Sequence, residues 1–103
     1  MHFVQTFRQN PIVPVIVIDQ SKHAIPLAKT LLDAGFSTIE ITLRTPCALE
    51  AIHAIRTALP TMTVGAGTIL TTEQLSLAKA AGAQFAVSPG LLTSLVKQAH
   101  FRV

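Results

Sequence analysis

The chain has 103 residues and is poor in cysteine, in charge and in long apolar runs, and each shortage excludes a class of protein. Cys47 is the only cysteine, so no internal disulfide can form and a reducing cytoplasm is the expected compartment. Residues 1–10 contain no long apolar stretch of the kind found in a signal peptide. No apolar run reaches the ~18 residues that a membrane span needs. We therefore expect a cytoplasmic protein without a membrane partner.

Charged residues make up only 13% of the chain, and the formal net charge is +3. Lysine and arginine are scattered, without a basic cluster or a ribbon of alternating basic and aromatic residues, which argues against nucleic acid as a partner. The four histidines and Cys47 lack the spacing of metal ligands, so we expect no metal site.

Apolar residues make up 50% of the chain, and they gather in short runs. Residues 12–18 are apolar on both faces of an extended strand, a pattern typical of parallel strands that are covered on both sides. The runs predict four strands, over residues 12–18, 38–43, 62–65 and 84–87.

Helical segments lie between these strands and have capping signals. Pro26 fits the opening turn of a helix that begins at residues 21–23 and ends before Gly35. Thr45 as N-cap and Pro46 at the first helical position predict a second helix that reaches about residue 59.

A third helix is expected to begin at the capping box of residues 71–74 and to close at Gly82. A fourth is predicted over residues 92–100. Alternating strands and helices indicate the α/β class, with a parallel sheet and right-handed crossovers. Four such units make either a small open sheet or half of an eight-stranded barrel, and periodicity alone leaves both open.

The second predicted strand carries charge on one face. Alternation places Glu40 and Arg44 on the same side, with Cα atoms roughly 13 Å apart if the strand stays extended. At that distance they reach a ligand more easily than each other. Because burial of such charges is costly, the pattern favours a site. The alternative is an exposed edge strand with a solvated polar face.

Two glycine-containing segments end neighbouring strands. Gly65-Ala66-Gly67-Thr68 follows the third predicted strand, where glycine permits close approach of a ligand or of the backbone. Leu70 stands where a dinucleotide-binding loop has its third glycine, so no nicotinamide cofactor is expected. Ser88-Pro89-Gly90 ends the fourth strand. Either segment is alternatively a plain turn, but carboxyl ends of parallel strands converge on sites.

Four segments together resemble the bacterial 2-keto-3-deoxy-6-phosphogluconate / 4-hydroxy-2-oxoglutarate (KDPG/KHG) aldolases. They are residues 14–17, residues 39–45 (Ile-Glu-Ile-Thr-Leu-Arg-Thr), residues 64–68 (Val-Gly-Ala-Gly-Thr) and residues 83–90 (Ala-Gln-Phe-Ala-Val-Ser-Pro-Gly). The resemblance implies a (β/α)₈ TIM barrel, of which this chain covers about four βα units. Residues 1–103 are accordingly expected to form the N-terminal half of such a barrel.

The resemblance also implies an activity and site residues. The activity is reversible cleavage of a 2-keto-3-deoxy sugar acid phosphate, or of 4-hydroxy-2-oxoglutarate, to pyruvate and an aldehyde, without a metal or an organic cofactor. By resemblance, Glu40 is the general acid/base and Arg44 holds the pyruvate carboxylate. Thr68 lines the same pocket and Pro89 lies at its wall. Family members assemble as homo-oligomers, typically trimers.

One element of the family pattern has no counterpart here. In the family, the lysine that forms the Schiff base lies on the sixth strand in a Phe-Lys-x-Phe-Pro context, whereas the lysines of this chain all fall in predicted helices: Lys22, Lys29, Lys79 and Lys97. Without that amine there is no imine to act as an electron sink. The expectation is therefore a family member that is inactive alone, or else a non-catalytic half-barrel that self-assembles or binds small 2-oxo acids.

Overall fold

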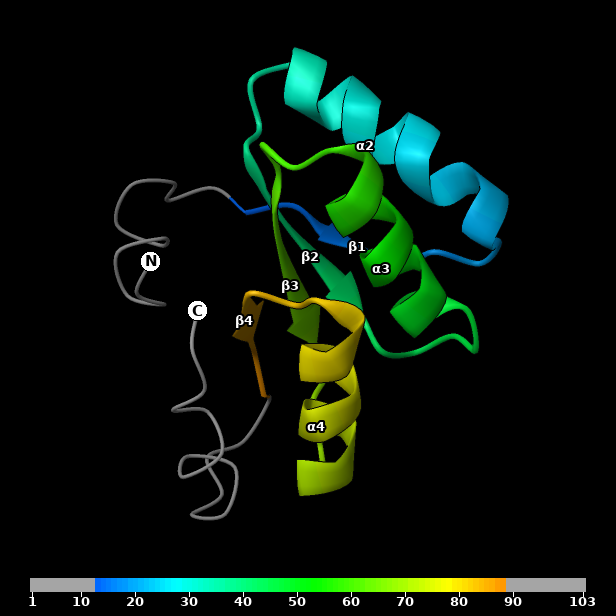
Figure 1. Ribbon diagram of the computed structural model, residues 1–103, viewed down its shortest axis with the longest axis vertical. Coiled ribbons are helices and arrows are strands. Elements are labelled where there is room, and N and C mark those ends of the chain that lie inside the picture. The colour runs from blue at the N-terminus through cyan, green and yellow to red at the C-terminus, as the bar shows by residue number, and fades with distance from the viewer. Residues whose placement is uncertain (1–12, 89–103) are drawn as a thin grey trace.

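Strands and helices alternate along residues 13–88, the part of the chain that this computed structural model describes (Figure 1). The strands are β1 (Val15–Ile16), β2 (Thr38–Thr42), β3 (Thr63–Gly67) and β4 (Phe85–Ala86). The helices are the 3₁₀ turn η1 (Ser21–His23), α2 (Ala24–Asp33), α3 (Ala48–Ala58) and α4 (Thr72–Ala81). The predicted order of elements in this part of the chain is confirmed.

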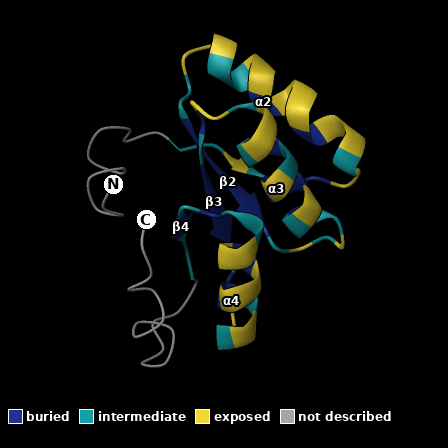
Figure 2. Cartoon of the chain, viewed as in Figure 1, coloured by how far each residue is buried: buried dark blue, intermediate teal, exposed yellow. Residues whose placement is uncertain are grey.

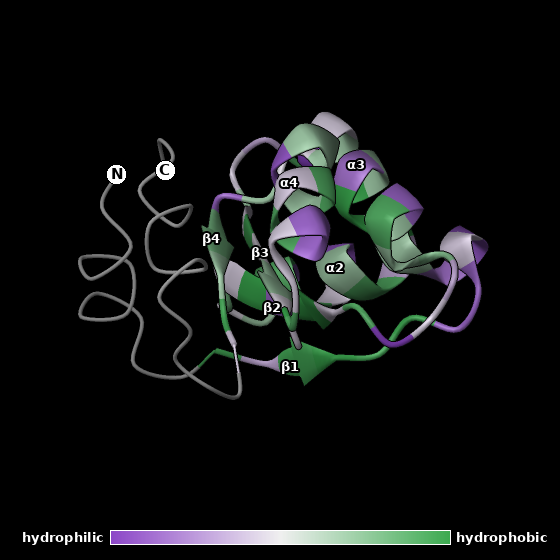
Figure 3. Ribbon diagram, turned by 90° about the horizontal axis from the view of Figure 1, so that it is seen from below, coloured by the Kyte–Doolittle hydropathy of each residue, from purple (hydrophilic) through white to green (hydrophobic). Residues whose placement is uncertain are grey.

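The sheet has the order β1-β2-β3-β4, and every neighbouring pair is parallel. Helices α2, α3 and α4 lie together on one side of it (Figure 3). A doubly wound open sheet reverses its strand order and carries helices on both faces, whereas a (β/α)₈ barrel keeps sequence order and one helical layer. Among the described elements, the arrangement is that of the barrel.

The core lies between the sheet and these helices. Ile39 and Ile41 of β2, with Val64 and Ala66 of β3, are fully buried against the helical layer. The helices pack on the sheet mainly through small side chains. Their buried residues are Ala24, Ala28, Ala48, Ala51 and Ala78, together with the larger Ile52, Ile55 and Leu75. Figure 2 shows the resulting pattern, in which β2 and β3 are buried and the outer helix surfaces are exposed.

Helices α2 and α4 carry the predicted residues at their ends. Pro26 lies in the first turn of α2, and Gly35 follows that helix with a φ of 102°. The Thr71 side chain accepts a hydrogen bond from the Gln74 amide (3.0 Å), and Gly82 ends α4 with a φ of 108°. Both glycines have the left-handed backbone that glycine adopts without a steric penalty. The helix predicted over residues 92–100 lies outside the described residues.

The predicted start of the second helix is wrong. Helix α3 begins at Ala48 with Cys47 as its N-cap, three residues after the expected position. The Thr45 hydroxyl instead donates to the Ile18 carbonyl oxygen at 2.6 Å, and therefore does not cap the helix. The start of α3 is thus determined by a hydrogen bond between residues 27 apart in sequence and not by the local capping pattern.

The boundary of the third strand also differs from the prediction, which ended it at residue 65. Gly65, Ala66 and Gly67 pair with β2 residues 40–42 and belong to β3. Glycine weakens a strand because it has no side chain to pack. Here the glycines stay in the sheet because β3 pairs with β2 on one side and with β4 on the other.

Candidate functional site

The face of the sheet opposite the helices carries the polar residues of β2. Because side chains alternate along a strand, Thr38, Glu40 and Thr42 point away from the core that Ile39 and Ile41 enter. Strand β2 pairs with β1 on one side and with β3 on the other. The alternative of an exposed edge strand is therefore wrong, and every residue of β2 is buried.

Glu40 is the central ionisable group of this inner face, and its side chain is only 8% exposed. Burial raises the pKa of the Glu40 carboxyl above its usual range, since desolvation penalises the ionised form. A carboxyl with a raised pKa both takes up and releases protons more readily near neutral pH than an exposed glutamate. Such a group at a sheet's carboxyl end is a candidate for acid/base chemistry.

The two glycines of β3 make room for side chains of the neighbouring strands. A Cβ atom at Gly67 would lie 2.7 Å from Cδ of Glu40, so the carboxylate of Glu40 occupies the space that a side chain would take. A Cβ atom at Gly65 would overlap the ring of Phe85. The sequence predicted close approach of a ligand or of the backbone at these glycines, whereas the structure shows close approach of two side chains, those of Glu40 and Phe85.

The carboxyl ends of β2, β3 and β4 are joined by backbone hydrogen bonds. The Leu43 amide donates to the Gly67 carbonyl oxygen (2.9 Å), and the Ile69 amide donates to that of Val87 (3.0 Å). These bonds bring the segments around Arg44, Thr68 and Ser88 to one edge of the sheet. The Glu40 carboxylate reaches the same edge because it lies over Gly67.

Thr68 has a strained backbone at this edge. Its φ is 60°, and it is the one non-glycine residue with positive φ in the described part of the chain. A β-branched residue in this region is a steric outlier, and such strain typically costs about 1–3 kcal/mol. Strain of this kind concentrates at functional sites, which strengthens the case for Thr68.

Arg44 lies differently from the expectation. Strand β2 ends at Thr42, so Arg44 stands in the exposed turn that follows and does not extend the polar face of the strand. The Arg44 segment is held at the site edge by its neighbour Leu43 and by the bond from Thr45 to Ile18. Pro89 lies outside the described residues.

Sequence reasoning overlooked Phe85, whose side chain is buried (1% exposed) on the inner face, in the same cross-strand row as Glu40 with Gly65 between them. The available signal was size complementarity, since the largest residue of the fourth predicted strand faces a glycine of the third. That signal is readable only once the strand register is known.

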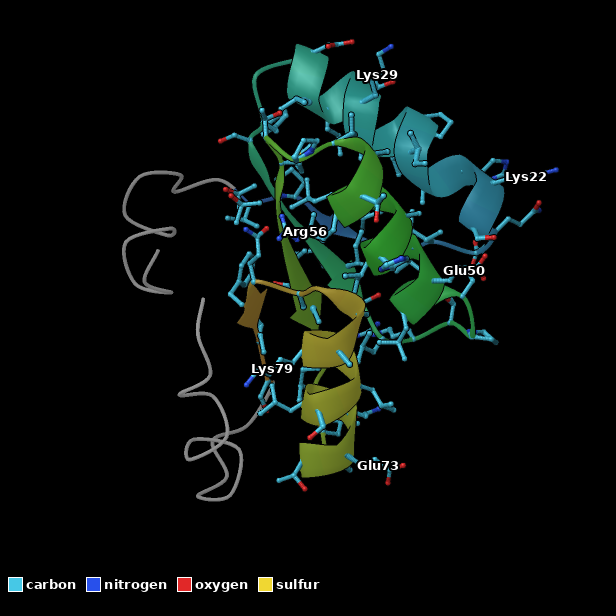
Figure 4. All side chains as sticks on the ribbon, in the orientation of Figure 1. Lys22, Lys29, Glu50, Arg56, Glu73 and Lys79 are labelled. Carbon is cyan, nitrogen blue, oxygen red and sulfur yellow. The ribbon has the colours of Figure 1, made fainter. Side chains whose placement is uncertain are left out.

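The described lysines all lie on helical elements. Lys22, Lys29 and Lys79 are exposed in η1, α2 and α4, and Figure 4 shows Lys22 and Lys29 pointing outward from the helical layer. Within residues 13–88, no three His, Cys, Asp or Glu side chains gather to hold a metal ion. The helices of that range are also too short or too polar to cross a membrane.

Comparison with known proteins finds one family. The sequence pattern of the KDPG and KHG aldolases matches residues 4–102. The KHG/KDPG aldolase of Escherichia coli is 52% identical over 89 residues, which are 86% of this chain and 42% of that protein. The 2-dehydro-3-deoxy-phosphogluconate aldolase of Dickeya dadantii is 50% identical over 95 residues, or 92% of this chain and 45% of the relative.

Solved structures agree with the sequence relatives. The 2-keto-3-deoxy-6-phosphogluconate aldolase of Zymomonas mobilis superposes with a TM-score of 0.91 at 43% identity, covering 96% of this chain and 48% of that one. The KDPG aldolase of Legionella pneumophila, solved with pyruvate captured as a covalent carbinolamine, has a TM-score of 0.85 at 41% identity and covers 89% and 45%. The chain spans about half the length of these relatives, and it belongs to the KDPG and KHG aldolase family of class I aldolases.

Proposed function

We propose that this chain supplies the acid/base part of an aldolase site, with Glu40 as the group that transfers protons. The carrying observation is the buried Glu40 carboxylate over Gly67, at the edge where three strands end. The proposed reaction is the reversible cleavage of a 2-keto-3-deoxy sugar acid phosphate, or of 4-hydroxy-2-oxoglutarate, to pyruvate and an aldehyde. The proposed partners are thus small molecules.

Formation of a Schiff base explains why this group is needed. An amine adds to the keto carbon of pyruvate, and the resulting carbinolamine loses its hydroxyl as water only after that oxygen receives a proton. The imine then loses a proton from the methyl carbon to give the enamine. Glu40 is proposed to give the first proton and to take the second, directly or through a water molecule.

Arg44, Thr68 and Pro89 are proposed to bind the substrate. A guanidinium pairs with a carboxylate through two parallel hydrogen bonds, and the exposed Arg44 at the site edge is available for the carboxylate of pyruvate. Thr68, held with a φ of 60° next to Gly67, would line the pocket beside the reacting carbon. Pro89 is proposed as its wall.

The Schiff-base amine is proposed to come from outside the described residues. An amine nucleophile must be deprotonated, which takes burial or a neighbouring cation. Lys22, Lys29 and Lys79 are exposed, which supports their exclusion. The chain alone is accordingly proposed to be inactive and to complete its site with the second half of a barrel. The assembled protein is proposed to work in the cytoplasm as a homo-oligomer, which by family resemblance is a trimer.

The test has two stages. Borohydride reduction of the chain with pyruvate, followed by intact-mass analysis, is expected to give no adduct. A C-terminal fragment of the Escherichia coli relative, bearing the Schiff-base strand, is then added in trans. Turnover should appear, vanish in Glu40→Gln, and survive in Glu50→Gln, which makes the same change at an exposed position on α3. Equal turnover of the two variants would overturn the role of Glu40.

A second candidate is binding of small 2-oxo acids without catalysis. The exposed guanidinium of Arg44 favours it, because capture of a carboxylate needs no amine. Calorimetry with pyruvate is expected to show affinity that Arg44→Ala reduces by about 1.5–3 kcal/mol, the usual contribution of a charge-assisted hydrogen bond. Lys22→Ala, which removes a charge from the far helical surface, is the matched control.

A further inference from the structure

One row of inner-face residues crosses all four strands and contains Glu40. Val15, Glu40, Gly65 and Phe85 are partners in the strand register. Gly65 therefore lies directly between Glu40 and Phe85, and its missing side chain leaves a space that either neighbour can fill. Whichever side chain enters this space excludes the other.

The ring of Phe85 takes that space. A Cβ atom at Gly65 would overlap the Phe85 ring, whereas the carboxylate of Glu40 lies over Gly67, two residues further along β3. The Cγ and Cδ atoms of Glu40 lie 3.0 and 2.7 Å from where the Gly67 Cβ would be. Because successive same-face residues are roughly 6.6 Å apart along a strand, this lean brings the carboxylate toward the carboxyl edge.

We infer that Phe85 is a positioning residue for Glu40. Its ring fills the space over Gly65 and so holds the Glu40 carboxylate over Gly67, at the edge where the chain segments of Arg44 and Thr68 converge. The two glycines then have different roles. Gly65 makes room for the Phe85 ring, which keeps the carboxylate out of the space over Gly65, and Gly67 makes room for the carboxylate at the carboxyl edge of the sheet. The inference rests on the proposed role of Glu40 for its functional meaning, but not for its geometry.

The ring of Phe85, which fills the space over Gly65 in the row of Glu40, is inferred also to limit access of water to the carboxylate. The described inner-face neighbours of Glu40 are Val15 on β1, Thr38 and Thr42 on β2, the glycines of β3 and Phe85 on β4. None of these is titratable, and Arg44, on the turn after β2, is the nearest charged residue along the chain. Burial is the resolved cause of the raised pKa of Glu40, so loss of the ring should lower that pKa.

The test follows the ionisation of Glu40 in the whole chain by ¹³C NMR of labelled glutamate side chains. In Phe85→Leu the titration midpoint of Glu40 should move down toward that of an exposed glutamate, because the carboxylate gains water and the space over Gly65. Phe85→Met, which keeps an unbranched apolar chain, is measured in parallel in case the leucine variant does not fold. Adding Gly65→Ala to Phe85→Leu refills the space with a methyl group and should return the midpoint toward that of the unchanged protein.

Ile52→Val is the matched control, since it weakens the core on the helical side of the sheet without a change on the inner face. A midpoint that is unchanged in both Phe85 variants, or that moves equally in Ile52→Val, would overturn the inference. Because the readout is ionisation and not turnover, a moved midpoint in a chain that never restores aldolase activity supports the positioning role while refuting the proposed function.

Discussion

At the scale of single residues, the inner face of β2 works against stability. Glu40 is buried with a raised pKa, and the hydroxyl of Thr38, only 1% exposed, has no hydrogen-bond partner among the described residues. A buried polar group without a partner costs about 1–3 kcal/mol. Both features, the desolvated carboxyl of Glu40 and the unpartnered hydroxyl of Thr38, lie on the same face of β2 and weaken its packing.

The first prediction concerns the pH dependence of stability. The folded-state pKa of Glu40 is raised, so the folded chain binds more protons than the unfolded chain between the two pKa values, and stability falls as pH rises through that window. Each unit of difference corresponds to about 1.4 kcal/mol. Glu40→Gln should therefore be more stable than the unchanged chain at pH 7 and lose this advantage near pH 4.

Urea denaturation at both pH values measures the difference. Glu50→Gln, at an exposed position, should show no comparable gain at pH 7. A Glu40→Gln variant that is less stable than the unchanged chain at pH 7 would show that the ionised carboxylate has a stabilising partner.

The second prediction concerns Gly67. Gly67→Ala places a methyl group where Cδ of Glu40 would lie 2.7 Å away, and so should destabilise the chain by about 1–3 kcal/mol, as overpacking does. In a Glu40→Ala background the same change meets no carboxylate and should cost much less. A double-mutant cycle by thermal denaturation checks this, and additive effects would contradict the close approach of Glu40 to Gly67.

At the scale of secondary-structure elements, capping distinguishes the helices. Helix α4 has a reciprocal cap: Thr71 accepts from the Gln74 amide, and the Gln74 side chain accepts from the Leu70 amide at 2.7 Å. Helix α3 has no side-chain cap, and its start is tied to the strand layer by Thr45 and Cys47, which both donate to the Ile18 carbonyl oxygen. The first arrangement stabilises a helix locally, while the second holds the Arg44 turn against the end of β1.

The third prediction tests the local cap. Thr71→Ala should destabilise the chain by about 1 kcal/mol, because the Gln74 amide loses its acceptor. Thr57→Ala makes the same truncation inside α3, where the hydroxyl donates to the His53 carbonyl oxygen within the helix. That change should be neutral or slightly stabilising, since alanine is the better helix former. Equal losses of melting temperature would contradict the capping role.

These elements show how far the sequence alone could go. The order of elements, the caps of α2 and α4 and the buried charge at Glu40 follow from local patterns and alternation. The start of α3 and the extent of β3 were wrongly predicted because both depend on contacts with distant segments, from Thr45 to Ile18 and from Gly67 to Thr42. The pairing of Phe85 with Gly65 depends on register between separate strands, which no local signal specifies.

At the scale of the whole molecule, helices cover one face of the sheet in residues 13–88, and the other face carries the candidate site. Within residues 13–88, β1 and β4 each pair on one side only, and Val15 and Val17 are 62% and 49% exposed. Val15 belongs to the inner-face row of Glu40, and Val17 shares its side by alternation. Exposed apolar residues beside an unpaired strand edge are a typical surface for association.

The last prediction is that the chain self-associates through this surface. Val15→Lys with Val17→Lys should lower the association constant at least tenfold, because two charges would have to be desolvated at an apolar contact. Leu77→Lys, on the outer side of α4 and 48% exposed, is the matched control and should leave association unchanged. Sedimentation equilibrium over a range of micromolar concentrations measures all three proteins. A monomeric unchanged chain across that range would refute the prediction, and equal dissociation by Leu77→Lys would move the contact to the helical layer, away from the Glu40 face.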